Sequence, residues 1–129
     1  MPVLHLGIEN NTDKELCLTE CWTNDSHKRH YNMSETDEDL IEAHTRRTDM
    51  FRIGNFSGFK GGASVFMGQT KLGCIEFKLE MSGKNYFDIS NYNVVVDGKV
   101  YTLSERCHEP QSYTPHFYIV VEEKPVGQH

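Results

Sequence analysis

The strongest alternation of hydrophobic and polar positions in the chain lies within Leu72–Leu103. Hydrophobic residues fall at every second position early in this stretch, namely Ile75, Phe77, Leu79 and Met81. The residues between them are charged, namely Glu76, Lys78 and Glu80. A period of two residues places one face of a strand on a core and the other in water. The pattern therefore predicts a half-buried strand whose outward face is solvated.

A turn and a hairpin are expected in the remainder of this stretch. Ser82–Asn85 has turn chemistry, and Tyr86–Ile89 returns to residues that are typical of strands. Val94–Val96 and Val100–Leu103 flank the dipeptide Asp97-Gly98. Asp-Gly between two hydrophobic runs is a strong hairpin signal. Leu72–Leu103 is therefore predicted to be a meander of strands around which the rest of the sheet is built.

Two further strands are expected at the N-terminus, over Val3–Glu9 and Glu15–Trp22. The apolar residues that alternate in phase are Leu4, Leu6 and Ile8 in the first and Leu16, Leu18 and Trp22 in the second. Asn10–Asp13 lies between them and has turn chemistry, because Asn and Asp tolerate positive φ and bond to their own backbone. The pattern predicts a first hairpin.

The polar segment Thr23–Asp39 leads into a region with two interpretations. Ser34 followed by Asp37, with Arg46-Arg47 further on, suits the cap and the dipole of a short helix. The alternative is a loop that leads into an extended segment at Leu40-Ile41, because the apolar face of such a helix is thin. The sequence leaves both open.

The remaining segments are short. Asp49–Ile53 and Ala63–Met67 are strand candidates, and the compact apolar run Phe117–Val121 predicts a buried final strand. Asn55–Gly62 is rich in Gly, Phe and Ser and is expected to form a loop. Ser104–Pro115 has two prolines and no periodicity, so it is expected to be irregular.

Many short strands separated by closely spaced turns predict an all-β protein. We expect one domain over residues 1–129, folded as a single antiparallel β-sandwich of about eight strands with at most one short helix. No apolar run approaches the roughly 20 residues that cross a bilayer, so no transmembrane segment is expected. The first ten residues lack the features of a signal peptide. This leaves a cytoplasmic protein, non-classical secretion or numbering from a cleaved leader open.

Charge and cysteine content narrow the possibilities. The net charge is −6 and the sequence pI is near 5.6, which argues against nucleic acid as a partner. Cys17 and Cys21 would lie about 13 Å apart along a strand, too far for a mutual disulfide. Bridges from these two to Cys74 and Cys107 stay open, and buried free thiols are favoured. Asn10 begins the first of four Asn-x-Ser/Thr sequons, which matter only in a secreted chain.

No catalytic or metal-binding motif stands out in the sequence. The chain has seven histidines, but no pair of them has the spacing of a recognised ligand motif. On a strand, Cys107 and His108 would point to opposite faces, so they could not act together as nucleophile and base. We expect no catalytic residue, no metal and no cofactor. This favours a binding protein and leaves enzymatic activity open.

Aromatic residues in expected turns are the candidates for a binding site. They are Phe56, Phe59, Tyr86, Tyr92 and Tyr113. An exposed aromatic side chain can enter a membrane interface or stack on a sugar, because it joins an apolar body to a polar tip. The alternative for these five residues is packing in the core. Core packing is the favoured role of three other aromatic residues, Phe66, Phe77 and Phe117.

A family resemblance rests on five segments, namely Gly7–Thr12, Gly61–Phe66, Ile75–Phe77, Asn85-Tyr86 and Asn91–Val94. Together they resemble the actinoporin-like cytolysins, which are β-sandwich proteins that bind phosphocholine lipids through exposed aromatics. In length and acidity the chain resembles the aegerolysins, another small lipid-binding β-sandwich group. The resemblance assigns headgroup contacts to Tyr86 and Tyr92. The chain departs from the cytolysins at Lys78 and Glu80, where they carry Ser and Pro, and lacks the paired tryptophans of the aegerolysins.

The function we expect is non-catalytic recognition of a membrane lipid by loop aromatics at one end of the sandwich. A lectin module that binds a glycan is the first alternative. A small enzyme or ligand carrier with a pocket between the sheets is the second, and a protein-interaction or inhibitor domain that uses a sheet edge is the third. The sequence leaves a homo-oligomer open.

Overall fold

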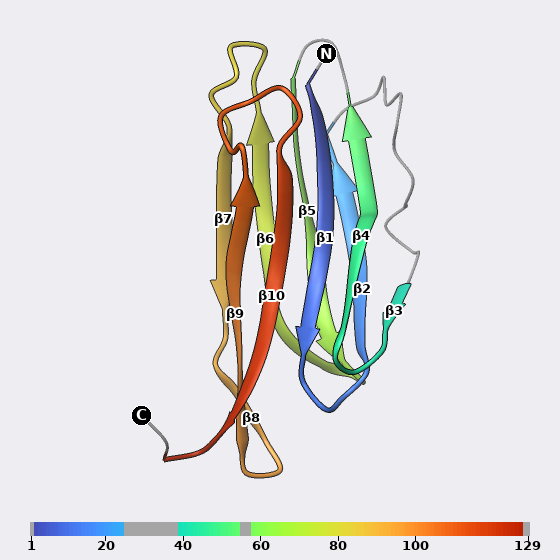
Figure 1. The fold of residues 1–129 in the computed structure, drawn as a ribbon, viewed down its shortest axis with the longest axis vertical. Coiled ribbons are helices and arrows are strands. Elements are labelled where there is room, and N and C mark those ends of the chain that lie inside the picture. Colours follow the sequence, from blue (N-terminus) through green and yellow to red (C-terminus); the bar gives the residue numbers. More distant parts are fainter. Residues whose placement is uncertain (1, 25–38, 55–57, 128–129) are drawn as a thin grey trace.

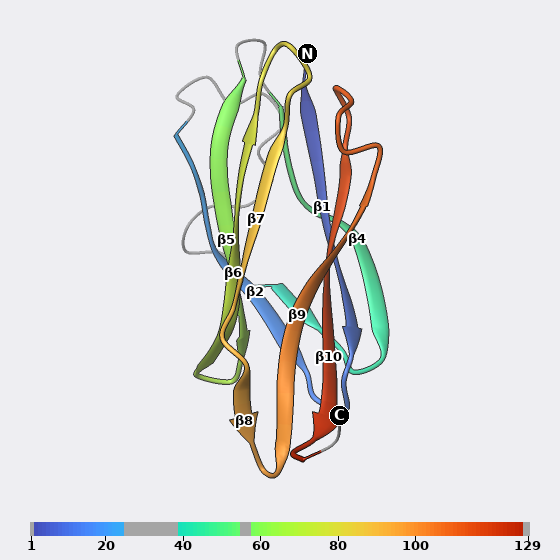
Figure 2. The ribbon, with the colours of Figure 1, turned by 90° about the vertical axis from the view of Figure 1, so that its left-hand side faces the viewer.

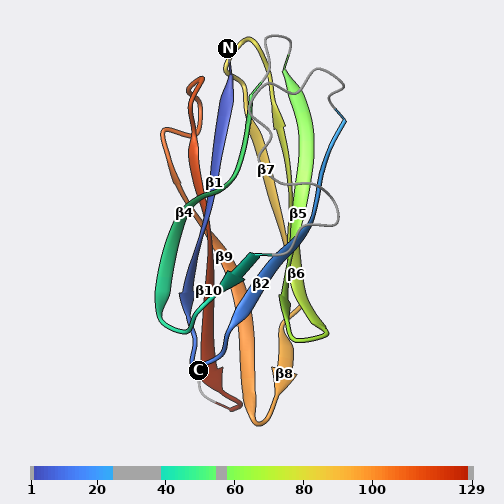
Figure 3. The ribbon, with the colours of Figure 1, turned by 90° about the vertical axis from the view of Figure 1, so that its right-hand side faces the viewer.

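The computed structural model describes residues 2–24, 39–54 and 58–127, whose strands form two five-stranded sheets packed face to face (Figure 1). The first sheet has the order β4 (Thr45–Gly54), β1 (Val3–Asn11), β10 (His116–Pro125), β9 (Lys99–His108) and β8 (Val94–Val96). The second has the order β3 (Asp39–Ile41), β2 (Leu16–Thr23), β5 (Phe59–Met67), β6 (Thr70–Leu79) and β7 (Tyr86–Asn91). Figures 2 and 3 show the two layers edge-on.

The all-β prediction is confirmed for the described residues, with ten strands in place of about eight. One pairing departs from the expected antiparallel pattern, because β1 and β10 lie side by side in parallel. Their register runs from His5 opposite His116 to Asn11 opposite Glu122. This pair joins the first and last strands in the middle of the first sheet. The sequence of a turn can predict a hairpin, because the turn joins the two paired strands. No turn joins β1 to β10, so the sequence contains no comparable signal for their pairing.

The core is built from the alternating apolar positions that the sequence indicates. Leu4, Leu6 and Ile8 of β1 are fully buried, and Ile75, Phe77 and Leu79 of β6 are almost so. Rings from opposite sheets meet where Phe87 stacks on Phe117, with ring centroids 4.7 Å apart. Each such fully buried side chain contributes roughly 1.5–3 kcal/mol. Met81 is one exception among the expected core residues, since β6 ends at Leu79 and Met81 is exposed. Phe66 is another, because it is only half-buried and does not belong to the core cluster.

Two expectations about local structure are corrected. Phe59–Gly62, expected to be part of a loop, forms the beginning of β5, while residues 55–57 lie outside the described part. Ser104–His108, expected to be irregular, continues β9, because it pairs with β10 along its whole length. In both cases the partner strand supplies a hydrogen-bonding ladder that the local sequence pattern does not reveal.

The short helix expected from the cap at Ser34 to the arginines near residue 46 is not formed where the structure describes it. Residues 39–41 and 45–54 are the strands β3 and β4, so the alternative of an extended Leu40-Ile41 is confirmed. Ile41 is fully buried, and Glu9 holds Arg46 by an ion pair, so strand contacts outweigh the helix signals. Ser34 and Asp37 lie outside the described residues. Within the described part of the chain, no helix could span a membrane.

A bulge in β2 changes the phase of its second half. Glu20 has a positive φ of 54°, and the pairing with β5 shifts between Thr19 and Trp22. The extra residue turns Cys21 into the core, where it is fully buried, and turns Trp22 to the outer face. The expectation that Trp22 shares a face with Leu16 is therefore wrong.

Charged side chains tie together the end of the sandwich where β1 ends and β9 begins. Asp13 accepts a hydrogen bond from Lys99 Nζ at 3.2 Å and lies 2.6 Å from His44 Nε2. Lys99 also lies 3.3 Å from Glu123 of β10. The hydrogen bond with His44, and then those with Lys99 and Glu123, lower the pKa of Asp13 to about 2.

The turn after β1 is fixed by a buried amide. Asn10 Nδ2 donates to the carbonyl oxygens of Lys14, Ile41 and Glu42, at 2.8–3.2 Å. Its Oδ1 accepts from the backbone N–H and the hydroxyl of Thr12. Asn10 is fully buried, so this sequon is closed to glycosylation in the folded protein. One side chain thus joins the β1–β2 turn to the β3–β4 connection.

We expect Asn10→Ala to lower the free energy of unfolding by about 2–4 kcal/mol, because it leaves several buried polar groups without partners. The exposed neighbour Asn11 provides a matched control, and Asn11→Ala should change stability by no more than about 0.5 kcal/mol. Urea unfolding followed by tryptophan fluorescence measures both. Equal effects of the two substitutions would contradict this role for Asn10.

Candidate functional site

The outer face of the second sheet is hollowed where β2, β5, β6 and β7 lie side by side. We name as the tryptophan hollow a depression of ≈ 200 Å³ near the start of β7, lined by Trp22, Lys60, Gly61, Glu76, Phe77, Lys78 and Tyr86. Strand register builds it from two cross-strand rows. One row is Trp22, Gly62 and Glu76. The other is Lys60, Lys78 and Tyr86.

A pair of glycines makes room for this hollow. A Cβ on Gly62 would collide with the indole of Trp22 and would lie 2.6 Å from the carbonyl oxygen of Ile75. A Cβ on Gly61 would lie 2.6 Å from the ring of Phe77 on the inner side. Glycine within a strand often marks a close approach by another group. The indole therefore lies across the backbone of β5, where another residue would hold it away.

The charges around the tryptophan hollow are of both signs. The ammonium groups of Lys60 and Lys78 come from paired positions on adjacent strands, and Lys78 Nζ lies 3.3 Å from Glu80. Glu76 is exposed beside Trp22. The same two lysines also line a neighbouring hollow of ≈ 230 Å³ that extends to Met81. A ligand in these hollows would meet aromatic rings, two cations and the carboxylates of Glu76 and Glu80.

Two connections, the one before β7 and the one between β9 and β10, lie at the nearest end of the sandwich (Figure 2). They carry exposed apolar side chains. Asn85, before β7, donates through Nδ2 to the carbonyl oxygens of Pro110 and Ser112, between β9 and β10. Met81, Tyr86 and Tyr113 lie on or beside these connections, and we name them the apolar tip. They are 50%, 58% and 51% exposed. Tyr86 belongs to both the apolar tip and the tryptophan hollow.

The structure separates the five aromatic residues that the sequence singles out. Tyr86 and Tyr113 lie at the same end, whereas Tyr92 follows the opposite end of β7. Phe59 is 4% exposed and packs edge-on against Phe77 in the core, so it is not available at the surface. Phe56 lies outside the described residues.

The sequence pattern alone does not single out Trp22, Lys60, Glu76 or Lys78 as site residues. It predicts only that Glu76 and Lys78 lie on a solvated strand face. The dipeptide Gly61-Gly62 is the available signal, because glycine in a strand admits a close neighbour such as an aromatic ring. This signal depends on the pairing of β5 with β2, which the sequence pattern does not predict.

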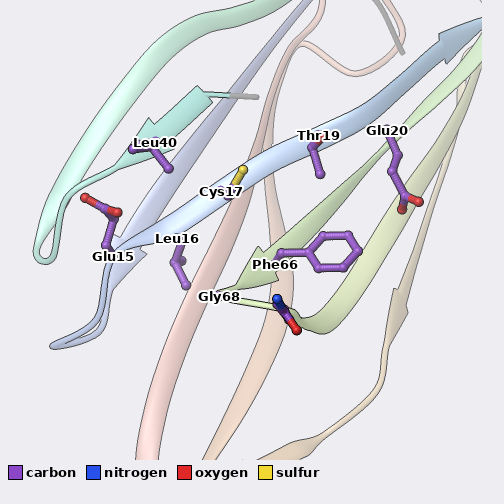
Figure 4. A pocket seen from close by; sticks show the side chains of 9 residues that line it. Glu15, Leu16, Cys17, Thr19, Glu20, Leu40, Phe66 and Gly68 are labelled. Atoms are coloured by element: carbon purple, nitrogen blue, oxygen red, sulfur yellow. The ribbon is translucent and has the colours of Figure 1, made fainter. Parts of the chain in front are cut away.

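A larger hollow of ≈ 480 Å³ lies on the same sheet toward its other end (Figure 4). Its lining includes the ring of Phe66, the exposed side chain of Leu40 and the carboxylates of Glu15 and Glu20. Glu20 is held by Lys71 at 3.3 Å. A hydrogen bond with Ser64, and then Lys71, lower the pKa of Glu20. The area between the two hollows is therefore polar, because Glu20, Lys71 and Glu76 all line it.

The four cysteines, which all lie within the described residues, form no disulfide. Cys21 is fully buried, and the others are half-buried. Burial, and then the nearby Glu105, raise the pKa of Cys107 to about 11. Cys107 packs toward the core and His108 is exposed, so their opposite orientation is confirmed. The described residues contain no group of three or more His, Cys, Asp or Glu placed to hold a metal ion.

Comparison with known proteins identifies the fold. No family model and no curated protein matches the chain. The crystal structure of IP-1A from Alcaligenes faecalis is similar, with a TM-score of 0.70 and 14% identity over 97% of this chain and 93% of that one. The RahU protein, solved in complex with a TRIS molecule, has a TM-score of 0.66 and 8% identity, over 99% and 98% of the two chains. The chain shares its two-sheet fold with these proteins.

We expect Gly62→Ala to displace the Trp22 indole, to shift its emission to longer wavelength and to lower stability by about 1–3 kcal/mol. A double-mutant cycle with Trp22→Ala separates the two contacts of the new methyl group. In the Trp22→Ala background, Gly62→Ala should lower stability by less, because the new methyl group then meets the carbonyl oxygen of Ile75 but no indole. Strict additivity of the two substitutions would show that the indole does not lie on Gly62.

Proposed function

We propose that this protein binds membrane lipid headgroups without catalysis, with the apolar tip in the interface and a headgroup in the tryptophan hollow. The observation that carries this proposal is their continuity through Tyr86. An exposed apolar group beside an aromatic and basic depression suits a lipid, which presents hydrocarbon and a charged headgroup at one surface.

The chemistry of the tryptophan hollow favours a headgroup that carries both a phosphate and an amine. Lys60 and Lys78 offer two cations to a phosphate. Trp22 and Tyr86 supply aromatic rings, which attract a cation at their faces, and Glu76 lies beside them. A zwitterionic headgroup therefore suits a site with two ammonium groups and a carboxylate better than a simple anion does.

Two further considerations support the lipid proposal. The sequence resembles the actinoporin-like cytolysins and the aegerolysins, which are small β-sandwich groups that bind lipids. The end of the sandwich that carries the apolar tip is held rigid by the Asn85 hydrogen bonds, which lowers the entropic cost of inserting its side chains.

Glycan binding is the second candidate, favoured by the position of Trp22 over the glycine pair. An indole held flat against a sheet with polar groups around it can stack on a sugar ring. The two proposals differ in the role of the apolar tip, because a soluble glycan has no need of exposed Met81 and Tyr113. A glycan array and vesicles without glycolipid distinguish them directly.

We expect co-sedimentation with phospholipid vesicles, weakened about tenfold or more by Trp22→Ala or by the pair Lys60→Met and Lys78→Met. Tyr92→Ala is the matched control, because Tyr92 is as exposed as the tip residues but lies at the opposite end of β7. Circular dichroism checks that each variant is folded.

Two outcomes would contradict the lipid proposal. Failure of the native protein to bind vesicles of any headgroup composition would remove it, and binding to a soluble glycan would then favour the lectin. An equal loss of vesicle binding in Tyr92→Ala would show that the tryptophan hollow is not the contact.

A further inference from the structure

Three histidines lie side by side on the outer face of the first sheet. His5 of β1 is in register with His116 of β10, and His116 is in register with His108 of β9. We name these three residues the histidine row. Arg52 of β4 is in register with His5 and extends the row across a fourth strand. Residues from the two ends of the sequence thus form a single line across the sheet.

The imidazoles of His5 and His116 are stacked on one another. Their ring centroids are 4.4 Å apart, and their planes differ by 8°. His5 and His116 are half-buried, while His108 and Arg52 are exposed. When both stacked rings are protonated, two like charges face each other at this short distance, and an anion beside them would reduce the repulsion.

The surroundings of the histidine row carry excess positive charge. Arg106 and Arg46 lie over the ring of Tyr118, which follows His116 by two residues on the same face. Glu9, the carboxylate on this part of β1, is held between these two arginines and is mostly buried. Glu109, the residue after His108, is the acidic group next to the row in sequence. With Arg52, three arginines and two carboxylates of the described residues lie in or beside the row, whereas the whole chain has a net charge of −6.

The histidine row lies next to the apolar tip. His108 ends β9 and His116 begins β10, so the connection between them carries Tyr113. The backbone N–H of His5 donates to the carbonyl of Pro115 at 3.0 Å, and that of Val3 donates to Tyr113 at 2.7 Å. A membrane in contact with Tyr113 would therefore lie near the row.

We propose that the histidine row, with Arg52, is a second membrane contact that takes the headgroups of anionic phospholipids and strengthens as the pH falls. This inference rests on the proposed lipid binding and adds to it a lipid class and a pH range. Among side chains with ordinary pKa values, histidine is the one whose charge changes between about pH 5 and about pH 8, which sets the pH range in which the proposal is tested. Each charge near an anionic bilayer increases the affinity about fivefold.

Vesicles of phosphatidylcholine alone, and of phosphatidylcholine mixed with phosphatidylserine, test this proposal at about pH 7.5 and about pH 5.5. We expect acidification to strengthen binding to the mixed vesicles at least tenfold and to leave binding to the neutral vesicles nearly unchanged. Added salt should reduce the gain, because salt screens exposed charges.

Variants assign the gain to particular residues. The double substitution His108→Gln with His116→Gln should abolish most of it, whereas His44→Gln should retain it, since His44 lies at the other end of the sandwich beside Asp13. His108→Lys carries a permanent charge and should strengthen binding to the mixed vesicles already at about pH 7.5. This last variant tests the proposal at a pH at which acid unfolding has no effect.

The outcomes separate the two proposals. Absence of binding to both kinds of vesicle at both pH values would remove lipid binding itself. Binding that is insensitive to pH and to phosphatidylserine would overturn the histidine contact and leave the tryptophan hollow in place. An equal loss of the acid gain in His44→Gln would show that the charge effect does not come from this row.

Discussion

The parallel pairing of β1 with β10 is the contact on which the rest of the arrangement depends. It brings the first and last strands together in the middle of the first sheet, between β4 on one side and β9 on the other. Without it, the sheet would separate into two parts, β4–β1 and β10–β9–β8, because this pairing joins them in the strand order. The same pairing sets the register that stacks His5 on His116. One long-range contact thus fixes both the sandwich and the histidine row.

The tryptophan hollow depends on two local irregularities in an otherwise regular sheet. The bulge at Glu20 turns Trp22 to the outer face, and the absence of a side chain at Gly62 lets the indole lie on β5. Bulges and strand glycines weaken a sheet, so their coincidence on adjacent strands is consistent with a functional rather than a stabilising role. The burial of the alternating apolar residues of both sheets offsets the loss of stability that the bulge and the glycines cause.

The sequence predicts strands well where hydrophobic residues alternate, as in β1 and β6, and where Asp97-Gly98 closes a hairpin. The sequence pattern does not predict the strands at Phe59–Gly62 and Ser104–His108. Their local chemistry resembles that of a loop, and pairing with a neighbouring strand makes them extended. The site was harder to predict for the same reason. The chemistry of Tyr86 and Tyr113 points to a surface role. Regular alternation places Trp22 on the inner face, because the sequence does not reveal the bulge that shifts its phase. The histidines are adjacent only through strand register, which the sequence does not contain.

The proposed lipid binding requires that the end of the sandwich with the apolar tip contacts the membrane. Hydrogen exchange measured by mass spectrometry, with and without phospholipid vesicles, is the direct test. We expect slower exchange on vesicles in residues 80–86 and 109–115, with no change in residues 92–98 at the opposite end. Protection confined to residues 92–98, or spread evenly over both ends, would contradict it.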